Sequence, residues 1–256
     1  MVRIQLISDL HLEHRQDISN VPNMLEPCAD VLALVGDIGS PYDPKLAAFI
    51  EWAAARWPTV LYVPGNHEYY SQHRHTMTEI DHELNRICSK HPNVKLLINR
   101  CTDVGDVTFI GSTLWSWIPE EKTAYIQNYL NDFRLIYTDR GLLTPADVRA
   151  LYGGNVDFIQ HSIKAAHERK RTVVVLTHHA PSLHETSAPE HTGKDSCYGF
   201  ASSLSCLHDP TAIRLWCAGH THHNFHHKKE GYELISNQVG YSRPIKGYQR
   251  DFIIEV

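Results

Sequence analysis

The chain has 256 residues, with 24 Lys plus Arg against 29 Asp plus Glu and a formal net charge of −5. This balance argues against a protein that wraps nucleic acid, which would carry a basic patch, and it is typical of an ordinary charged surface. A chain of this length buries a full core without disulfides.

The sequence contains six cysteines, and none belongs to a CxxC pair. Several lie in or beside apolar runs, where a free cysteine behaves as a small hydrophobic residue. No apolar run approaches the ~18 residues of a membrane span. We expect no signal peptide at the start of the chain, although a protein whose leader had been removed would show the same sequence. We therefore expect a reduced, cytoplasmic protein with no membrane partner.

Five short apolar runs, each rich in Val, Ile or Leu, end abruptly in polar residues. They cover residues 3–8, 31–36, 60–65, 173–177 and 213–219. Runs of this length and composition predict buried strands. In open α/β sheets, ligands gather outside the carboxyl ends of the strands. We therefore expect the polar residues that follow the five runs to form one site.

Helices and further strands are predicted between and after these runs. Proline and N-cap signals open two of the helices, and helical spacing of polar residues marks a third. The predicted helices cover residues 44–52, about 71–90 and 144–169, and the predicted strands cover residues 94–97 and 107–111 and, as antiparallel strands, 232–236 and 251–255.

Two segments lack a clear periodicity. Residues 113–142 and 181–205 predict loop-rich insertions, and long loops beside site residues are often functional. We expect both to lie over the active site, with Trp115 and Trp117 packing in the core or in a lid. Because no linker divides the chain and the strand ends spread across it, we expect residues 1–256 to form a single domain.

The polar residues at the five strand ends include carboxylate, amide and imidazole groups but no thiolate. Such donors favour hard-to-borderline divalent cations. Each fragment alone also has an ordinary explanation, such as a turn aspartate after a glycine. The residues concerned are Asp9 and His11, Asp37, Asn66 and His67, His178 and His179, and His220 and His222.

Taken together, the ordered string D-x-H, G-D, G-N-H-E, H-H-A-P and G-H-T-H over residues 8–222 resembles the calcineurin-like metallophosphoesterases. The resemblance implies an α/β fold, a four-layer α/β/β/α sandwich of two mixed sheets flanked by helices. It also implies two divalent metal ions bridged by one carboxylate. The ligands that it implies are Asp9, His11 and His222 for the first ion, Asn66, His178 and His220 for the second, and Asp37 for both.

The resemblance further implies hydrolysis of a small phosphate ester by a metal-bridging hydroxide, with no covalent intermediate. His67 would face the substrate and protonate the leaving oxygen or stabilise phosphoryl charge, a role that suits the pKa of histidine. Four imidazole ligands favour Mn, Fe, Zn, Co or Ni over Ca and Mg. We expect an enzyme, a binuclear phosphoesterase.

Several other polar residues receive weaker assignments. Glu68 is expected to orient His67, unless it is a plain surface residue. His179 either contacts the substrate or supports a metal ligand, and Arg134 is a candidate phosphate contact. Seven other histidines are expected to be solvated. His73, His75, His82 and His91 mostly lie on a polar helix. His223, His226 and His227 lie on an exposed strand, with a third metal site as the alternative.

The aromatic content of residues 113–142 slightly favours small phosphodiesters or nucleotide-like esters as substrates. A phosphomonoesterase, including a phosphoprotein phosphatase, remains an alternative. So do a non-catalytic metal-binding scaffold of the same fold and a binuclear hydrolase of amides or lactones.

Overall fold

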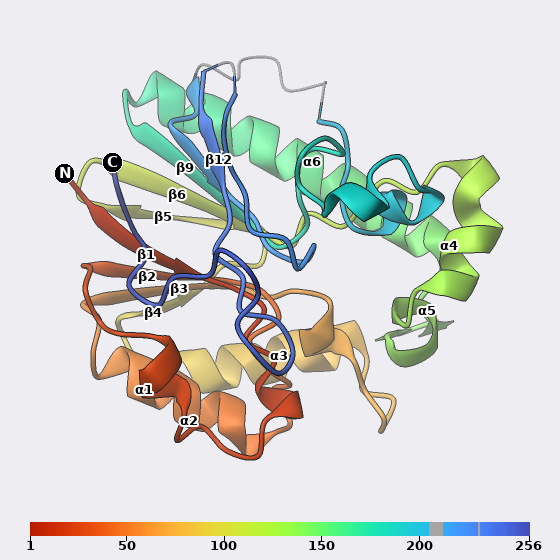
Figure 1. The fold of residues 1–256 in the computed structure, drawn as a ribbon, viewed down its shortest axis with the longest axis horizontal. Coiled ribbons are helices and arrows are strands. Elements are labelled where there is room, and N and C mark those ends of the chain that lie inside the picture. The colour runs from red at the N-terminus through yellow and green to blue at the C-terminus, as the bar shows by residue number, and fades with distance from the viewer. Residues whose placement is uncertain (205–211, 230) are drawn as a thin grey trace.

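The computed structural model describes residues 1–204, 212–229 and 231–256, so Cys206 and the last residue of the predicted 181–205 insertion lie outside the described part. Two large sheets lie face to face, with α1 to α3 outside one sheet and α6 outside the other (Figure 1). This four-layer arrangement confirms the predicted fold class. Within the described ranges, no helix combines the length and apolar character that a membrane span requires.

The first sheet has the strand order β13-β1-β2-β3-β4. Strands β1 to β4 are parallel, and β13 is antiparallel to β1. The helices over its outer face are α1 (Val21–Met24), α2 (Pro44–Ala54) and α3 (Met77–Cys88). The strands are β1 (Arg3–Ile7), β2 (Val31–Val35), β3 (Thr59–Val63), β4 (Val94–Leu96) and β13 (Ile253–Glu255).

The second sheet has the order β11-β12-β10-β9-β6-β5, and α6 (Pro145–Glu168) covers it. Its four central strands are parallel and its two edge strands are antiparallel. The prediction of antiparallel strands at the end of the chain therefore holds for β13 and for β11 with β12, but β12 is parallel to β10. The strands are β5 (Arg100–Val104), β6 (Val107–Ser112), β9 (Thr172–Thr177), β10 (Leu215–Cys217), β11 (His226–Lys228) and β12 (Glu233–Ile235).

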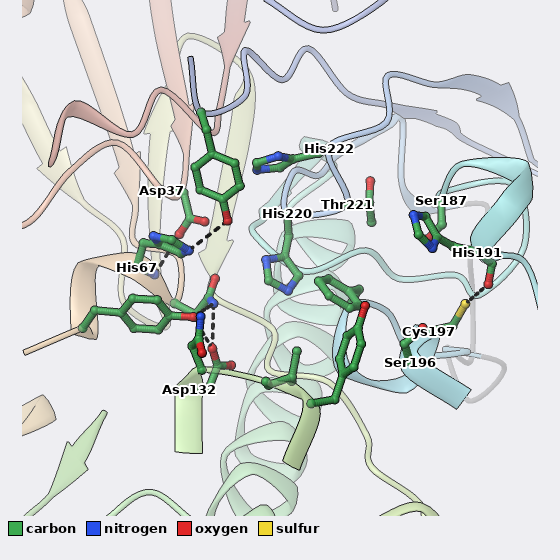
Figure 2. A pocket seen from close by; sticks show the side chains of 17 residues that line it. Asp37, His67, Asp132, Ser187, His191, Ser196, Cys197, His220, Thr221 and His222 are labelled. Atoms are coloured by element: carbon green, nitrogen blue, oxygen red, sulfur yellow. Dashed lines mark hydrogen bonds between the residues drawn. The ribbon is translucent and has the colours of Figure 1, made fainter. Parts of the chain in front are cut away.

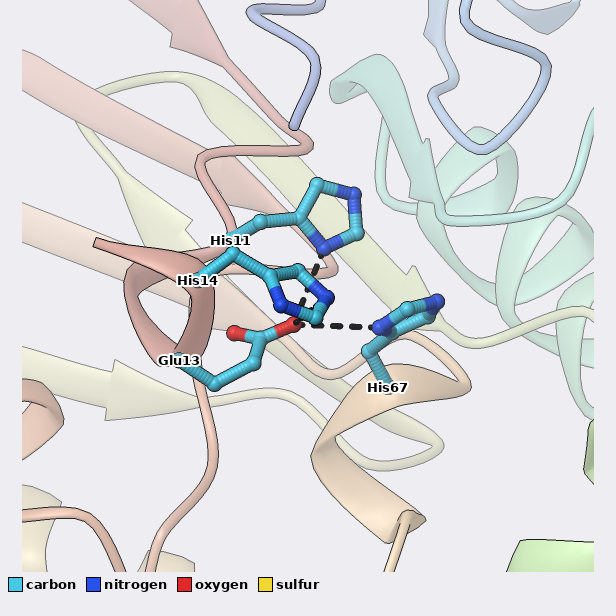
Figure 3. Close-up of side chains that lie close together, drawn as sticks. All are labelled: His11, Glu13, His14 and His67. Atoms are coloured by element: carbon cyan, nitrogen blue, oxygen red, sulfur yellow. Dashed lines mark hydrogen bonds and ion pairs between the residues drawn. The ribbon is translucent and has the colours of Figure 1, made fainter. Parts of the chain in front are cut away.

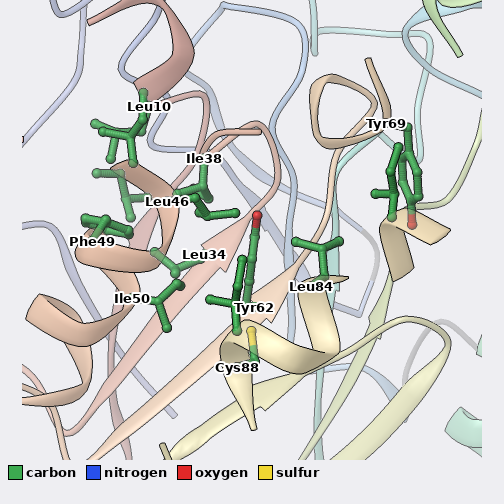
Figure 4. Close-up of a cluster of buried hydrophobic side chains, with 14 of the residues drawn as sticks. Leu10, Leu34, Ile38, Leu46, Phe49, Ile50, Tyr62, Tyr69, Leu84 and Cys88 are labelled. Carbon is green, nitrogen blue, oxygen red and sulfur yellow. The ribbon is translucent and has the colours of Figure 1, made fainter. Parts of the chain in front are cut away.

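Both faces of the central strands are buried. In β2, Val31 and Val35 point into the apolar layer between the sheets, while Leu34 points outward to the helices. On that outer face, Phe49 of α2 and Tyr62 of β3 belong to the same cluster (Figure 4). Burial of each such side chain stabilises the fold by roughly 1.5–3 kcal/mol. Two-sided burial explains why these strands appear in the sequence as continuous apolar runs.

A capping box sets the start of α3. The Thr76 hydroxyl accepts a hydrogen bond from the Glu79 N–H, and the Glu79 carboxylate accepts one from the Thr76 N–H. The helix predicted for residues 71–90 is therefore shorter than expected, because its first turn begins only after this cap. Of the four histidines assigned to it, His73, His75 and His91 lie outside the helix, and His82 is exposed on it.

The two predicted insertions hold short helices and turns. Residues 113–142 contain α4 (Thr123–Tyr129), α5 (Asp132–Leu135) and a hairpin of β7 (Tyr137–Thr138) with β8 (Gly141–Leu142). Residues 181–204 contain two short 3-10 turns, Pro189–His191 and Asp195–Gly199. We call residues 113–142 and 181–204 together the cap.

The two parts of the cap are fastened to each other. Lys122 Nζ lies 2.7 Å from Asp195 Oδ1, and the Trp117 N–H donates to the Ser202 hydroxyl over 2.6 Å. Trp115 is buried in the core, whereas Trp117 remains 45% exposed beside Tyr152. The cap is thus one covering layer with contacts from both insertions.

Candidate metal centre

The structure brings the polar ends of five strands together from both sheets. Residues after β1, β2 and β3 come from the first sheet, and residues after β9 and β10 come from the second. Seven side chains gather there, and we call them the ligand shell: Asp9, His11, Asp37, Asn66, His178, His220 and His222.

The first group of donors consists of Asp9, His11 and His222. The Nε2 atoms of the two histidines lie 3.1 Å apart, and His222 Nε2 lies 3.3 Å from Asp9 Oδ1. Ligands about 2.0–2.2 Å from one cation lie roughly 3.0–3.5 Å from one another in tetrahedral or octahedral geometry. The three donors therefore fit one divalent cation.

The second group has the same spacing. His178 Nε2 lies 3.1 Å from Asn66 Oδ1, 3.1 Å from His220 Nδ1 and 3.3 Å from Asp37 Oδ1. The other ring nitrogen of His178 donates to the Val35 carbonyl over 2.9 Å, so Nε2 is left as the ligand atom. These residues fit a second cation.

Asp37 joins the two groups. Its Oδ1 faces His178 of the second group, and its Oδ2 lies 3.8 Å from His11 Nε2 of the first. Burial alone would raise the pKa of Asp37, but the imidazoles of His178 and His67 hold that pKa well below its usual value. The carboxylate is therefore ionised and placed to bridge two ions.

Five of the seven side chains stand on left-handed backbone. The φ angles are 55° at Asp9, 48° at His11, 55° at Asp37, 68° at His220 and 48° at His222. Such conformations are uncommon outside glycine, and aspartate and histidine tolerate them better than most residues. Strained backbone of this kind clusters at functional sites.

Glu13 is a site residue that the sequence reasoning missed. Its Oε1 lies 3.0 Å from Nδ1 of His11 and 3.0 Å from Nδ1 of His67 (Figure 3). Burial would raise the pKa of Glu13, but the two imidazoles lower it to about 2. Burial would lower the pKa of His67, but Asp37 and Glu13 raise it to about 9. One carboxylate thus orients both a predicted ligand and the predicted catalytic histidine.

Among the described residues, the Glu68 carboxylate makes no hydrogen bond to the His67 ring, and Glu13 holds that ring instead. The Glu68 carboxylate instead accepts the N–H groups of Asp37 (3.0 Å), Ile38 (2.7 Å) and Gly65 (2.7 Å). It is fully buried. Glu68 therefore fixes the turns that carry two members of the ligand shell, Asp37 and Asn66.

Asp132, in α5 of the cap, holds the Asn66 amide. Asn66 Nδ2 donates to Asp132 Oδ1 over 2.9 Å, and the Tyr70 hydroxyl donates to the same oxygen over 2.7 Å. Because Nδ2 is engaged there, Asn66 Oδ1 faces His178. The sequence offered no signal for this contact, since Asp132 lies in a segment without periodicity.

A family model described as calcineurin-like phosphoesterase matches residues 2–224. The chain belongs to this family. The match confirms the resemblance drawn from the sequence motifs. Members of the family use divalent metals to hydrolyse phosphate esters, which agrees with the donor groups of this phosphoesterase.

Individual proteins are similar to this phosphoesterase over most of its length. An uncharacterized protein of Acanthamoeba polyphaga mimivirus, L509, is 31% identical over 258 residues, which cover 93% of this chain and 91% of L509. Phosphopantetheinyl hydrolase (PptH) from Mycobacterium tuberculosis has a TM-score of 0.64 at 19% identity, with coverage of 93% of this chain and 89% of that chain. A dimetal phosphatase from Danio rerio has a TM-score of 0.60 at 14% identity, covering 94% and 88%. Because their sequence identity to this chain is low, these two solved structures show only that the fold is shared.

Beside the ligand shell, the phosphoesterase has a cavity of about 370 Å³. Asp37, His67, His220 and His222 line one side, and the cap lines the other (Figure 2). The cavity is therefore open to both predicted ion positions and to the predicted catalytic histidine.

Two predicted substrate contacts lie away from this cavity. His179 is buried against Trp115, and its Nδ1 lies 3.3 Å from the Thr113 carbonyl; burial and His178 lower its pKa to about 3. The Arg134 guanidinium donates to the carbonyls of Asn128 and Leu130 within the cap. Neither residue lines the cavity among the described residues, so this arrangement gives no support to phosphate binding by Arg134 or substrate contact by His179.

Proposed function

We propose that this phosphoesterase hydrolyses small phosphate esters with two divalent cations held by the ligand shell. The observation that carries the proposal is the pair of donor groups with Asp37 between them. When bound, such a pair of ions lowers the pKa of a water and stabilises charge on the phosphoryl oxygens. The presence of all seven donors disfavours a scaffold without turnover.

The donor set also bears on which ions bind. Four imidazoles contribute, together with two carboxylates and one amide oxygen, and no thiolate. Imidazole-rich sites suit Mn, Fe, Zn, Co and Ni better than Ca or Mg, which prefer oxygen ligands. We propose an ion from the first set, with availability deciding which one.

His67 is the proposed proton donor to the leaving oxygen. It lines the cavity beside Asp37, and its Nδ1 is held by Glu13. Its Nε2 lies 3.4 Å from the Tyr241 hydroxyl at the cavity edge, so this nitrogen points toward the substrate space. Asp37 and Glu13 both favour the imidazolium form, which suits the ring to donate a proton.

We propose that the substrate is a small molecule. A volume of about 370 Å³ lies in the range of small-molecule pockets, which runs from about 300 to 1,000 Å³.

Both sheets supply ligands and share one apolar interior. For that reason we propose that residues 1–256 act as one domain.

The proposal is tested with p-nitrophenyl phosphate and bis(p-nitrophenyl) phosphate on the Mn²⁺-loaded protein. We expect hydrolysis of at least one ester, its loss after chelation and its recovery with Mn²⁺ but not Ca²⁺. Asp37→Asn should remove turnover, whereas Asp30→Asn, in an exposed ion pair with Arg3, should not. Full activity after chelation, or tight metal binding with no hydrolysis, would overturn the proposal.

A further inference from the structure

The cavity extends away from the ligand shell along the cap. Figure 2 shows Asp37 and His67 at one end and Ser187, His191 and Ser196 at the other. A phosphoryl group held by two ions occupies only the first end. The second end is therefore space for the organic part of the ester.

Aromatic and aliphatic side chains form the middle of this space. Phe200 packs on His220 of the ligand shell, with ring centroids 4.9 Å apart, and Tyr129 meets Phe200 edge to face at 6.5 Å. Leu130 lies beside them in the lining. Because Phe200 touches a predicted metal ligand, a ring bonded near the phosphate would lie within reach of its face.

Serine hydroxyl groups line the far end. Ser196 is only 4% exposed, and it lines the cavity. Ser187, which is half-buried, also lines this end. A hydroxyl that faces a cavity can exchange its hydrogen bonds with water for hydrogen bonds with a ligand. These groups are suited to the polar edge of a bound molecule.

The described cavity lining contains no lysine or arginine. Among the described residues it contains two carboxylates, Asp37 and Asp132, but no Lys or Arg. Both carboxylates lie at the metal end. At the far end no described lysine or arginine would neutralise a second anionic group on the substrate, and burying an unpaired charge is costly.

We propose that the cap forms a binding site for an uncharged aromatic or heteroaromatic ring with hydrogen-bonding edges, carried on a single phosphate ester. Phe200 and Tyr129 stack on the ring, and Ser196 and Ser187 bond to its polar edge. This inference rests on the proposed function, because the phosphate must sit on the ions. It adds a substrate class: small aryl or nucleoside-like esters, and not polyphosphates or polynucleotides.

The test uses phosphonates that are not hydrolysed, as competitive inhibitors of the Mn²⁺-loaded protein. Benzylphosphonate should bind more tightly than methylphosphonate, and a 4-carbamoyl group should tighten binding further. A 4-carboxyl group should weaken it. Phe200→Ala should raise the inhibition constant of benzylphosphonate roughly 3- to 10-fold and leave that of methylphosphonate unchanged. Ser196→Ala should remove only the gain from the carbamoyl group.

Tyr125→Ala is the matched control, because Tyr125 stacks on Tyr129 but does not line the cavity. It should leave every inhibition constant unchanged. Equal binding of benzylphosphonate and methylphosphonate, or an equal loss of both in Phe200→Ala, would overturn the inference while the proposed function stands. Failure of methylphosphonate to bind, together with no ester hydrolysis, would instead remove the proposed function.

Discussion

The ligand shell and the cap meet at one cavity, but they are built in different ways. The shell consists of residues directly after buried parallel strands, so the sheets hold its donors in place. The cap consists of short helices and turns joined by a few polar contacts, such as Lys122 with Asp195. In the proposed enzyme, the sheets position the metal-binding groups, and the cap forms the part of the cavity that selects the substrate. Binding residues commonly lie on loops that a rigid scaffold positions.

His67→Ala gives the largest expected effect and tests the shell side of the comparison. Turnover should fall roughly 10²- to 10⁴-fold, because the proton donor is lost. Metal content should be retained, since His67 belongs to neither group of the ligand shell. The measurement is steady-state hydrolysis of esters with poor leaving groups, with metal analysis alongside. His82→Ala, an exposed residue of α3, is the control, and unchanged turnover in His67→Ala would remove the assigned role.

Asp132→Leu asks whether the cap also supports the shell. Without the carboxylate, the Asn66 amide loses the contact that directs Oδ1 to the second ion. Affinity for that ion should fall roughly 10- to 100-fold, measured by competition with a chelator, while the first ion is unaffected.

Asp132→Asn keeps an acceptor oxygen for Asn66 and Tyr70, so it should retain most of the affinity. Equal weakening of both ions in Asp132→Leu would indicate general unfolding rather than control of the amide. Unchanged affinity for the second ion would show that Asp132 of the cap does not support metal binding by the ligand shell.

Gly36→Ala tests the backbone beneath the shell. Gly36 has a φ of +90°, and a Cβ there would lie 2.1 Å from Nδ1 of His178. We expect the free energy of unfolding to fall by about 1–3 kcal/mol from strain, measured by urea denaturation. Gly153→Ala in α6 meets nothing within 4 Å and should instead stabilise the protein by up to ~1 kcal/mol. Similar stability of both variants would contradict this view of the turn.

Glu13→Gln gives the smallest expected effect. Loss of the carboxylate should lower the pKa of His67, because Glu13 is one of the groups that raise it. Since a proton donor acts while protonated and is lost as the pH rises through its pKa, the alkaline limb of the pH–rate profile should move to lower pH. Turnover at neutral pH should fall about 3- to 10-fold. If the alkaline limb does not move, Glu13 does not raise the pKa of His67 in the active enzyme.

Much of the architecture follows from local pattern. Buried apolar runs predicted the central strands, and Thr144 with Pro145 marked the start of α6. The direction of strands near the sheet edge was harder to predict, because β12, next to the edge strand β11, pairs with one parallel and one antiparallel neighbour. The start of α3 was misplaced because spacing alone extended the helix past the Thr76 cap.

For the site, the sequence by itself determined which strand ends carry donor groups and in what order, because each donor immediately follows its own strand. Only the tertiary structure decided the partners of those donors. Glu13 rather than Glu68 holds His67, and Asp132 holds Asn66, 66 residues away in the chain. The lining of the cavity was likewise decided there. Such contacts depend on how separate segments pack against each other, and no local periodicity records that packing.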